Sequence, residues 1–96
     1  MTNRKRQPTH PGGILKRHYI EPLGLSISRL AAELHVSRKT ISKIANERGS
    51  ITPDMALRLS KAFDTSAELW LNLQTNYDLW NAASTSGEWE KVKTLV

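Results

Sequence analysis

The sequence of 96 residues has no cysteine, a single phenylalanine and no long run of apolar residues. The lack of cysteine excludes a disulfide framework and a thiolate metal site. No stretch approaches the length of a membrane span or of a signal peptide, so we expect a cytoplasmic protein that does not enter a membrane. A chain of this length forms one domain and buries only about 60–65% of its unfolded surface, so a partner would add stability.

Patterns typical of enzymes are also missing. The three histidines, His10, His18 and His35, have neither paired spacing nor a carboxylate at ligand spacing. We interpret His18 as a half-buried helix residue and His35 as a turn residue. The glycines lie at expected helix ends and form no phosphate-binding loop, and nearly all serines stand at expected helix caps. We therefore predict that the protein is not an enzyme and that it binds no metal and no cofactor.

Positive charge is abundant but unevenly placed. Residues 1–48 contain ten Lys or Arg and three Glu, which gives a net charge of +7. Residues 49–96 contain four Lys or Arg and six Asp or Glu, which gives a net charge of −2. A basic half beside a mildly acidic half indicates that one end of the molecule meets a polyanion. A basic surface without a partner is the simpler alternative, because such surfaces are common in small proteins.

The stretch 37–46 predicts a short helix with a basic outer face. Ser37 is a suitable N-cap, and Ile41, Ile44 and Ala45 recur with the spacing of one buried stripe. Two cations in the first turn oppose the helix dipole, at a cost of about 0.3–1 kcal/mol each, so a helix selected only for stability would carry acids there. The alternative interpretation is that this basic face is only solvated and contacts no partner. The outer face contains Arg38, Lys39, Ser42, Lys43 and Asn46.

A second short helix is predicted immediately before it, over residues 26–34. Only a tight turn fits between the two helices, and two short helices around such a turn make a helix-turn-helix, whose second helix enters the major groove of DNA. The small residues Ala31 and Ala32 suit a close crossing of the two helices. At His35 the turn requires a positive φ, which histidine adopts at a higher cost than glycine.

The remaining chain predicts three further helices, over residues 10–22, 52–63 and 66–80. Thr52 and Ser66 cap the last two of these helices, and Gly49 is the expected C-terminal cap residue after the basic helix. Residues 88–93 predict one or two helical turns. We therefore expect a flexible basic arm at 1–9, a helix-turn-helix domain at 10–80 and a C-terminal extension at 81–96. The buried stripe of the fourth helix is predicted to contain Met55, Ala56, Leu59, Ala62 and Phe63.

The fifth predicted helix carries more large apolar residues than one buried face requires. The surplus indicates a second contact surface, most simply with a two-fold partner, formed by Trp70, Leu73, Tyr77 and Trp80. The alternative is a helix that is buried on two sides within the monomer. Trp89, in the C-terminal extension, is either an anchor or exposed.

Several stretches resemble known DNA-binding families. Leu30-Ala31, Val36-Ser37 and residues 40–44 resemble the lambda-repressor/Cro-type (Xre-like) domains. The stretches 10–15, 21–26, 51–59 and 66–74 resemble the HigA-type (VapI-like) antitoxin branch, so the resemblance covers residues 10–80. It departs at Gly13, where the family usually has Glu, at Arg29, where Glu or Gln would complete a capping box with Ser26, and at His35.

The resemblance implies an all-α, five-helix lambda-repressor-like fold and a homodimeric repressor that binds a palindromic operator over its own promoter. It also implies neutralisation of a HigB-type endoribonuclease toxin, and the alternative is a stand-alone Xre-like regulator without a toxin. Arg38 or Lys39 is suited to pair with guanine, and Ser42 or Asn46 with other base edges. The predicted DNA-binding residues are Ser37, Arg38, Lys39, Thr40, Ser42, Lys43, Asn46 and Arg48.

Overall fold

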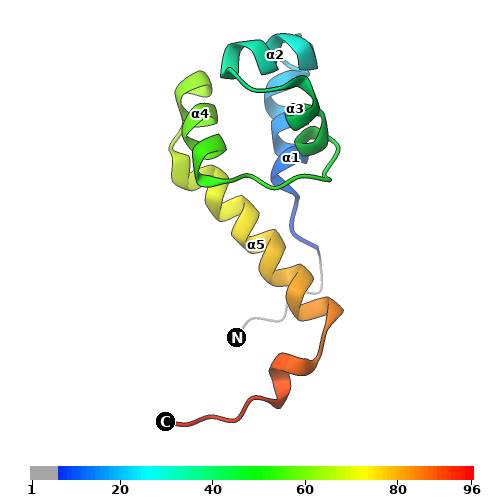
Figure 1. Ribbon diagram of the computed structural model, residues 1–96, viewed down its shortest axis with the longest axis vertical. Coiled ribbons are helices and arrows are strands. Elements are labelled where there is room, and N and C mark those ends of the chain that lie inside the picture. The colour runs from blue at the N-terminus through cyan, green and yellow to red at the C-terminus, as the bar shows by residue number, and fades with distance from the viewer. Residues whose placement is uncertain (1–6) are drawn as a thin grey trace.

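The computed structural model describes residues 7–96, and within that range its regular secondary structure is entirely helical (Figure 1). The basic residues Arg4, Lys5 and Arg6 of the predicted arm lie outside the described residues. The prediction of an all-α fold with five helices is confirmed. The α-helices are α1 (Pro11–Leu15), α2 (Ile27–Leu34), α3 (Arg38–Ala45), α4 (Pro53–Phe63) and α5 (Ala67–Thr85).

Side-chain caps start four of these helices as the sequence predicts. The hydroxyls of Ser26, Ser37, Thr52 and Ser66 each accept a hydrogen bond from the backbone amide three residues later, at 3.0–3.2 Å. Each cap satisfies one of the amides that a helix start leaves without a partner. The helix starts are therefore fixed locally, before any tertiary contact is made.

The first helix differs from the prediction in its second half. After α1 the chain continues as a π-helical turn, Lys16–Ile20, instead of an α-helix as far as Pro22. The Glu21 amide donates to the Lys16 carbonyl at 2.9 Å, five residues back, so the turn is wider than an α-turn. This turn carries Tyr19, which packs against Phe63 at 4.6 Å between ring centroids. His18 is exposed, so its prediction as a half-buried residue was wrong.

Three helices end on a left-handed residue that is not glycine: His35 with φ 58°, Glu47 with φ 62° and Asp64 with φ 54°. The positive φ at His35 is confirmed. The prediction that Gly49 ends α3 was wrong, because Glu47 takes this place and the Arg48 amide donates to the Lys43 carbonyl at 2.8 Å. Gly49 allows close packing instead, since an added Cβ would lie 3.3 Å from the Lys43 Cβ.

The core lies between the five helices, with Trp70 of α5 fully buried in it. The Trp70 indole nitrogen donates to the Thr65 hydroxyl at 2.8 Å, so burial leaves no polar atom of the ring without a partner. Ala62 is exposed, and the predicted stripe of α4 was too wide by this residue. Ala32 is exposed as well, which leaves Ala31 as the small residue at the crossing of α2 and α3.

Helix α5 is longer than predicted, and the second half of it projects beyond the other helices, so that the molecule measures 49 × 23 × 20 Å (Figure 1). The C-terminal segment turns away from the axis of α5 (Figure 1) and contains one 3₁₀ turn, Glu88–Lys91, where one or two helical turns were predicted. In the part of the chain that the structure describes, no helix is both long and apolar enough to cross a membrane.

Candidate nucleic-acid interface

Helix α3 is held by its apolar stripe and presents its polar side outward. Ile41, Ile44 and Ala45 are buried against α2 and α1, as the periodicity predicts. Arg38, Lys39 and the following polar residues therefore lie on the free side of the helix. An α-helix with its side chains is about 10–12 Å in diameter, which fits the width of about 12 Å of the major groove of DNA.

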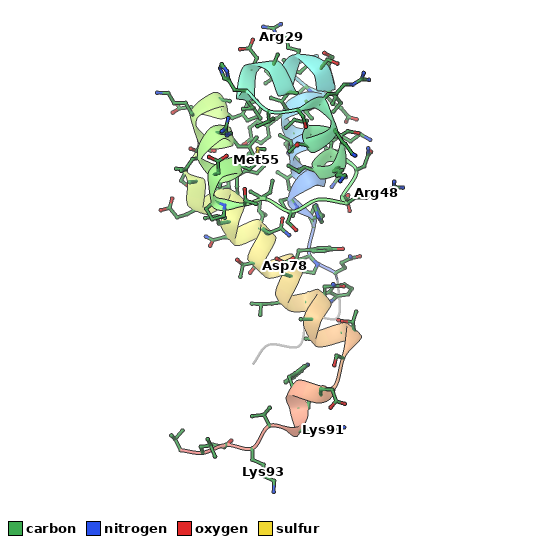
Figure 2. All side chains as sticks on the ribbon, in the orientation of Figure 1. Arg29, Arg48, Met55, Asp78, Lys91 and Lys93 are labelled. Atoms are coloured by element: carbon green, nitrogen blue, oxygen red, sulfur yellow. The ribbon has the colours of Figure 1, made fainter. Side chains whose placement is uncertain are left out.

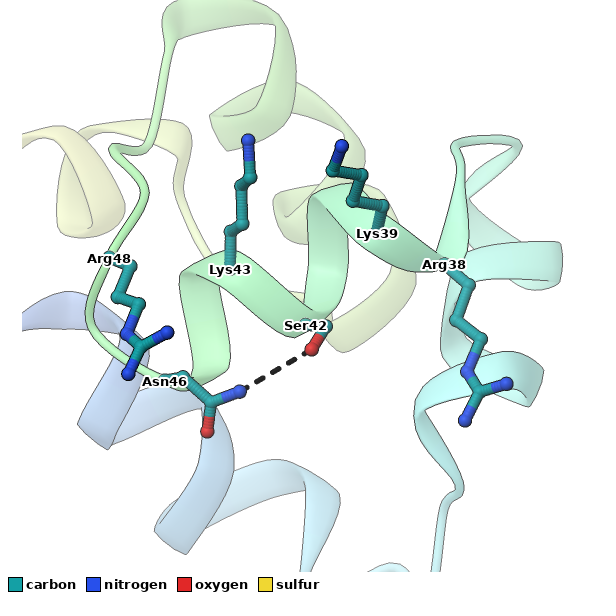
Figure 3. A pocket seen from close by; sticks show the side chains of 6 residues that line it. All are labelled: Arg38, Lys39, Ser42, Lys43, Asn46 and Arg48. Carbon is teal, nitrogen blue, oxygen red and sulfur yellow. Dashed lines mark hydrogen bonds between the residues drawn. The ribbon is translucent and has the colours of Figure 1, made fainter.

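Six of the eight predicted DNA-binding residues line one open hollow on this side of the molecule (Figure 3). Lys39 and Lys43, one helical turn apart, point in the same direction, and Arg38 and Arg48 lie at opposite ends of the hollow. Between them, the Asn46 amide donates to the Ser42 hydroxyl at 3.3 Å. The hollow is lined by Arg38, Lys39, Ser42, Lys43, Asn46 and Arg48.

Within residues 7–96, no carboxylate forms an ion pair with these cations. Among residues 7–96 the ion pairs are Arg29–Glu33, Arg58–Asp54 and Lys91–Glu88, and none of them involves α3. The nearest acid in the sequence, Glu47, turns toward α1, where its carboxylate would lie 3.0 Å from a Cβ added at Gly13. The surface therefore carries four unpaired positive charges, which attract a polyanion such as a phosphate backbone.

Ser37 and Thr40, the other two predicted contacts, are at the start of α3 but do not line the hollow. The Ser37 hydroxyl accepts from the Thr40 amide at 3.1 Å, and the two hydroxyls are 2.8 Å apart. Their side chains therefore satisfy the helix start and each other. A role of either residue in holding a phosphate stays a prediction.

Arg58 of α4 braces the helix-turn-helix, and the sequence analysis did not identify it. Its guanidinium donates to the carbonyl oxygens of Leu34 at 2.7 Å and of His35 at 3.3 Å, at the end of α2. Asp54 holds the same guanidinium at 2.7 Å. The i,i+4 spacing of Asp54 and Arg58 predicts only a surface pair, and nothing in the sequence indicates the contact across 24 residues.

The predicted contact residues on α5 differ in their burial. Trp70 belongs to the core and cannot meet a partner, so its prediction as a contact residue was wrong. Leu73, Tyr77 and Trp80 are half-buried, and the Tyr77 and Trp80 rings are 6.4 Å apart. Leu79, on the same half, has 63% of its surface exposed. The excess apolar surface of α5 is therefore real, but Trp70 is not part of it.

Comparison with known proteins places this geometry in a family. The model of the family HTH_3, described as helix-turn-helix, matches residues 17–70. The HTH-type transcriptional regulator YbaQ of Escherichia coli K12 is 44% identical over 98 residues, which cover 99% of this chain and 87% of YbaQ. Antitoxin HigA-1 of Vibrio cholerae serotype O1 is 36% identical over 96 residues, which cover 99% of this chain and 90% of HigA-1.

A solved structure of antitoxin GraA in complex with its operator superimposes with a TM-score of 0.90 and 41% identity, over 100% of this chain and 99% of GraA. The predicted resemblance and the prediction that the protein is not an enzyme are confirmed, because this family consists of DNA-binding regulators. The chain belongs to the helix-turn-helix family of Xre/Cro-type DNA-binding proteins and is similar to HigA antitoxins and to antitoxins that bind their operator.

Proposed function

We propose that this protein is a sequence-specific DNA-binding antitoxin of the cytoplasm that represses its own operon. The observation that carries the proposal is the outer face of α3, which presents unpaired cations and hydrogen-bonding side chains on a helix of groove width. The similarity to GraA, which was solved in complex with its operator, supports a DNA-binding function.

The positions of these residues on α3 suggest which of them contact base edges and which contact phosphates. Arg38 and Lys39, in the first turn, are suited to pair with guanine O6 and N7, and Ser42 and Asn46 with other base edges. Arg48 follows the helix in an exposed loop and suits a phosphate, which positions a protein without reading sequence. Ser37 and Thr40 at the helix start suit a phosphate as well.

Replacing Arg38 with alanine is expected to weaken operator binding by about 1–3 kcal/mol and to relax the preference at one base pair. The duplex is first selected from a random pool, and binding is then measured for that duplex and for its single-base variants. Lys93→Ala is the control, because this exposed lysine lies in the C-terminal segment, far from α3 (Figure 2). A loss that is equal for all sequences would contradict base reading by Arg38 and make it a phosphate contact.

We also propose that the protein is a homodimer through the projecting half of α5. Leu79 is largely exposed beside the half-buried Tyr77 and Trp80 rings, and a two-fold partner would cover this apolar surface. A dimer presents two reading helices about 34 Å apart, which matches a palindromic operator.

Replacing Leu79 with glutamate is expected to shift the protein from dimer to monomer in analytical ultracentrifugation. The two carboxylates at the interface would be desolvated without a compensating hydrogen bond or ion pair, which is unfavourable. The matched control is Leu57→Glu on α4, because Leu57 is 61% exposed, close to the 63% of Leu79. Equal sedimentation of Leu79→Glu and the unchanged protein would contradict the proposed interface.

The third part of the proposal is the neutralisation of a HigB-type mRNA endoribonuclease toxin. The 36% identity to antitoxin HigA-1 across almost the whole chain supports it. We expect the product of an adjacent gene, a small basic RNase-like protein, to co-purify with this chain and to lose its toxicity on coexpression. Neither result is expected if the protein is a stand-alone regulator.

The second candidate function is that of a stand-alone transcriptional regulator, and the 44% identity to YbaQ, which is named as a transcriptional regulator, favours it.

A further inference from the structure

Two polar residues are buried within residues 7–96: His10 is 5% exposed and Gln74 is 6% exposed. They are 64 positions apart in the sequence, yet both contact the loop 46–52 between α3 and α4. That loop carries Asn46 and Arg48 of the basic hollow. Buried polar side chains are costly unless they are fully bonded, so two of them at one loop fix its geometry.

His10 joins three parts of the structure at the start of α1. Its Nδ1 accepts from the Gly12 amide at 2.9 Å and caps α1. Its ring meets Tyr77 of α5 edge to face, with 4.7 Å between centroids, and the Gly49 backbone of the loop is near enough to raise the pKa of the ring. Because Nδ1 accepts, the ring is neutral and carries its proton on Nε2.

Gln74 holds the loop from the other side. Its Oε1 accepts from the Ile51 amide at 2.7 Å, and its Nε2 donates to the Asp78 carboxylate at 2.9 Å. Both ends of the side-chain amide are therefore used. Ile51 itself is buried in the core, so the end of the loop cannot slide without breaking this bond.

Arg48 directly precedes the two positions of the loop that His10 and Gln74 contact. The Arg48 and Gly49 amides both donate to the Lys43 carbonyl, at 2.8 and 3.1 Å, which folds the loop back onto the end of α3. His10 lies against the loop one residue after Arg48, and Gln74 bonds the loop three residues after it. The Arg48 guanidinium thus projects from backbone that is held by the end of α3 before it and by these contacts after it, at one end of the hollow (Figure 3).

We propose that His10 and Gln74 are positioning residues for DNA binding. They hold the loop 46–52 against α1 and α5, so that Arg48 is already in position to contact a phosphate of the duplex. This inference rests on the proposed contact of Arg48. A restrained arginine loses less conformational entropy on binding than one on a free loop, so the restraint adds affinity without touching DNA.

The test is a set of double-mutant cycles read by the salt dependence of binding to the selected duplex. Arg48→Ala is expected to weaken binding five- to tenfold and to lower the slope of log K against log salt by about 0.9, the value for one phosphate contact. His10→Asn and Gln74→Met are each expected to reproduce most of both effects. Asparagine is chosen because its oxygen still caps α1 while the ring that reaches Gly49 and Tyr77 is lost.

Combined with Arg48→Ala, the two variants are expected to add less than a twofold further loss, because the group they position is gone. Combined with Arg38→Ala, at the far end of the hollow, their losses should multiply. A purely structural role lowers the folded fraction and leaves the salt slope unchanged, so an unchanged slope or multiplying losses with Arg48→Ala would overturn the proposal. If Gln74→Met does not fold, because the Ile51 amide loses its partner, His10→Asn alone decides.

The proposed function and the positioning role fail differently. A wild-type protein that selects no duplex would overturn the DNA-binding function. Binding that needs Arg38 but not Arg48 would leave that function intact and overturn the role of His10 and Gln74.

The pH dependence of the stability gives a second test of the role of His10. Burial lowers its pKa from 6.5, while Glu47 of the loop, Asp78 of α5 and the Gly49 backbone partly raise it, and Tyr77 covers the ring. The pKa of His10 is therefore lower in the folded than in the unfolded protein. The neutral, buried ring contributes its full share to the stability of the fold above pH 6.5, and this contribution is lost as the pH falls through the folded pKa. Thermal unfolding should show a larger acid loss for the unchanged protein than for His10→Asn. Equal losses would count against the burial of the His10 ring and against its role as the cap of α1.

Discussion

Replacing Trp70 with alanine is expected to lower the free energy of unfolding by about 3–5 kcal/mol, the range for a buried Trp→Ala change. The ring is fully buried, contacts Tyr19 at 5.4 Å between centroids and donates to the Thr65 hydroxyl at 2.8 Å. Its removal leaves a cavity between α5 and the other helices and deprives the Thr65 hydroxyl of a partner. The melting temperature should fall by more than about 12 °C in a domain of this size.

Trp89→Ala is the matched control for this change, because Trp89 is exposed on the C-terminal segment. Surface substitutions of this kind change stability by about 0.5 kcal/mol or less. Circular dichroism during urea unfolding measures both variants. A Trp70→Ala loss no larger than that of Trp89→Ala would contradict the position of Trp70 in the core.

Replacing Gly12 with alanine is expected to cost at least about 3 kcal/mol, at the upper end of the range for overpacking. A Cβ at Gly12 would lie 1.7 Å from the Ile44 carbonyl oxygen, which is backbone and cannot rotate away. Helix α1 would have to move off the end of α3. The higher helix propensity of alanine, worth about 1 kcal/mol, does not offset this. Operator binding should weaken as well, because α1 supports the basic helix.

Gly13→Ala is a stringent control for this prediction, since it changes the next residue of the same helix in the same way. An added Cβ there meets the Arg17 guanidinium at 2.7 Å and the Glu47 carboxylate at 3.0 Å, which are the ends of flexible side chains. We expect no loss of stability, or a gain of up to about 1 kcal/mol from helix propensity. Thermal unfolding compares the two variants, and equal losses at both positions would contradict the close contact of α1 and α3.

The sequence predicted those features that depend on neighbouring residues. Caps such as Ser37 and Thr52 bond amides three residues away, and the stripe of α3 follows from helical period alone. The exposed basic face follows in turn, because the stripe decides which side is buried. The positive φ at His35 was predictable since the turn between α2 and α3 is too short for any other path.

Features that depend on distant contacts were missed. The contact of Arg58 with the end of α2 and that of Gln74 with Ile51 join residues more than twenty positions apart, and no local pattern encodes them. The apolar excess of α5 was correctly recognised, but the sequence could not show that Trp70 is the residue used by the core. Likewise Gly49 is the residue type expected in a left-handed helix cap, and only the structure shows that Glu47 adopts this conformation instead.

The central claim is that the free side of α3 is the surface that meets DNA. The most direct measurement is a heteronuclear NMR titration of the protein with the selected duplex, with backbone amides assigned. The largest shift changes are expected at residues 37–48, with smaller changes on α4 and on the outer end of α5. Changes concentrated on α5 and the C-terminal segment, with the amides of α3 unaltered, would contradict it.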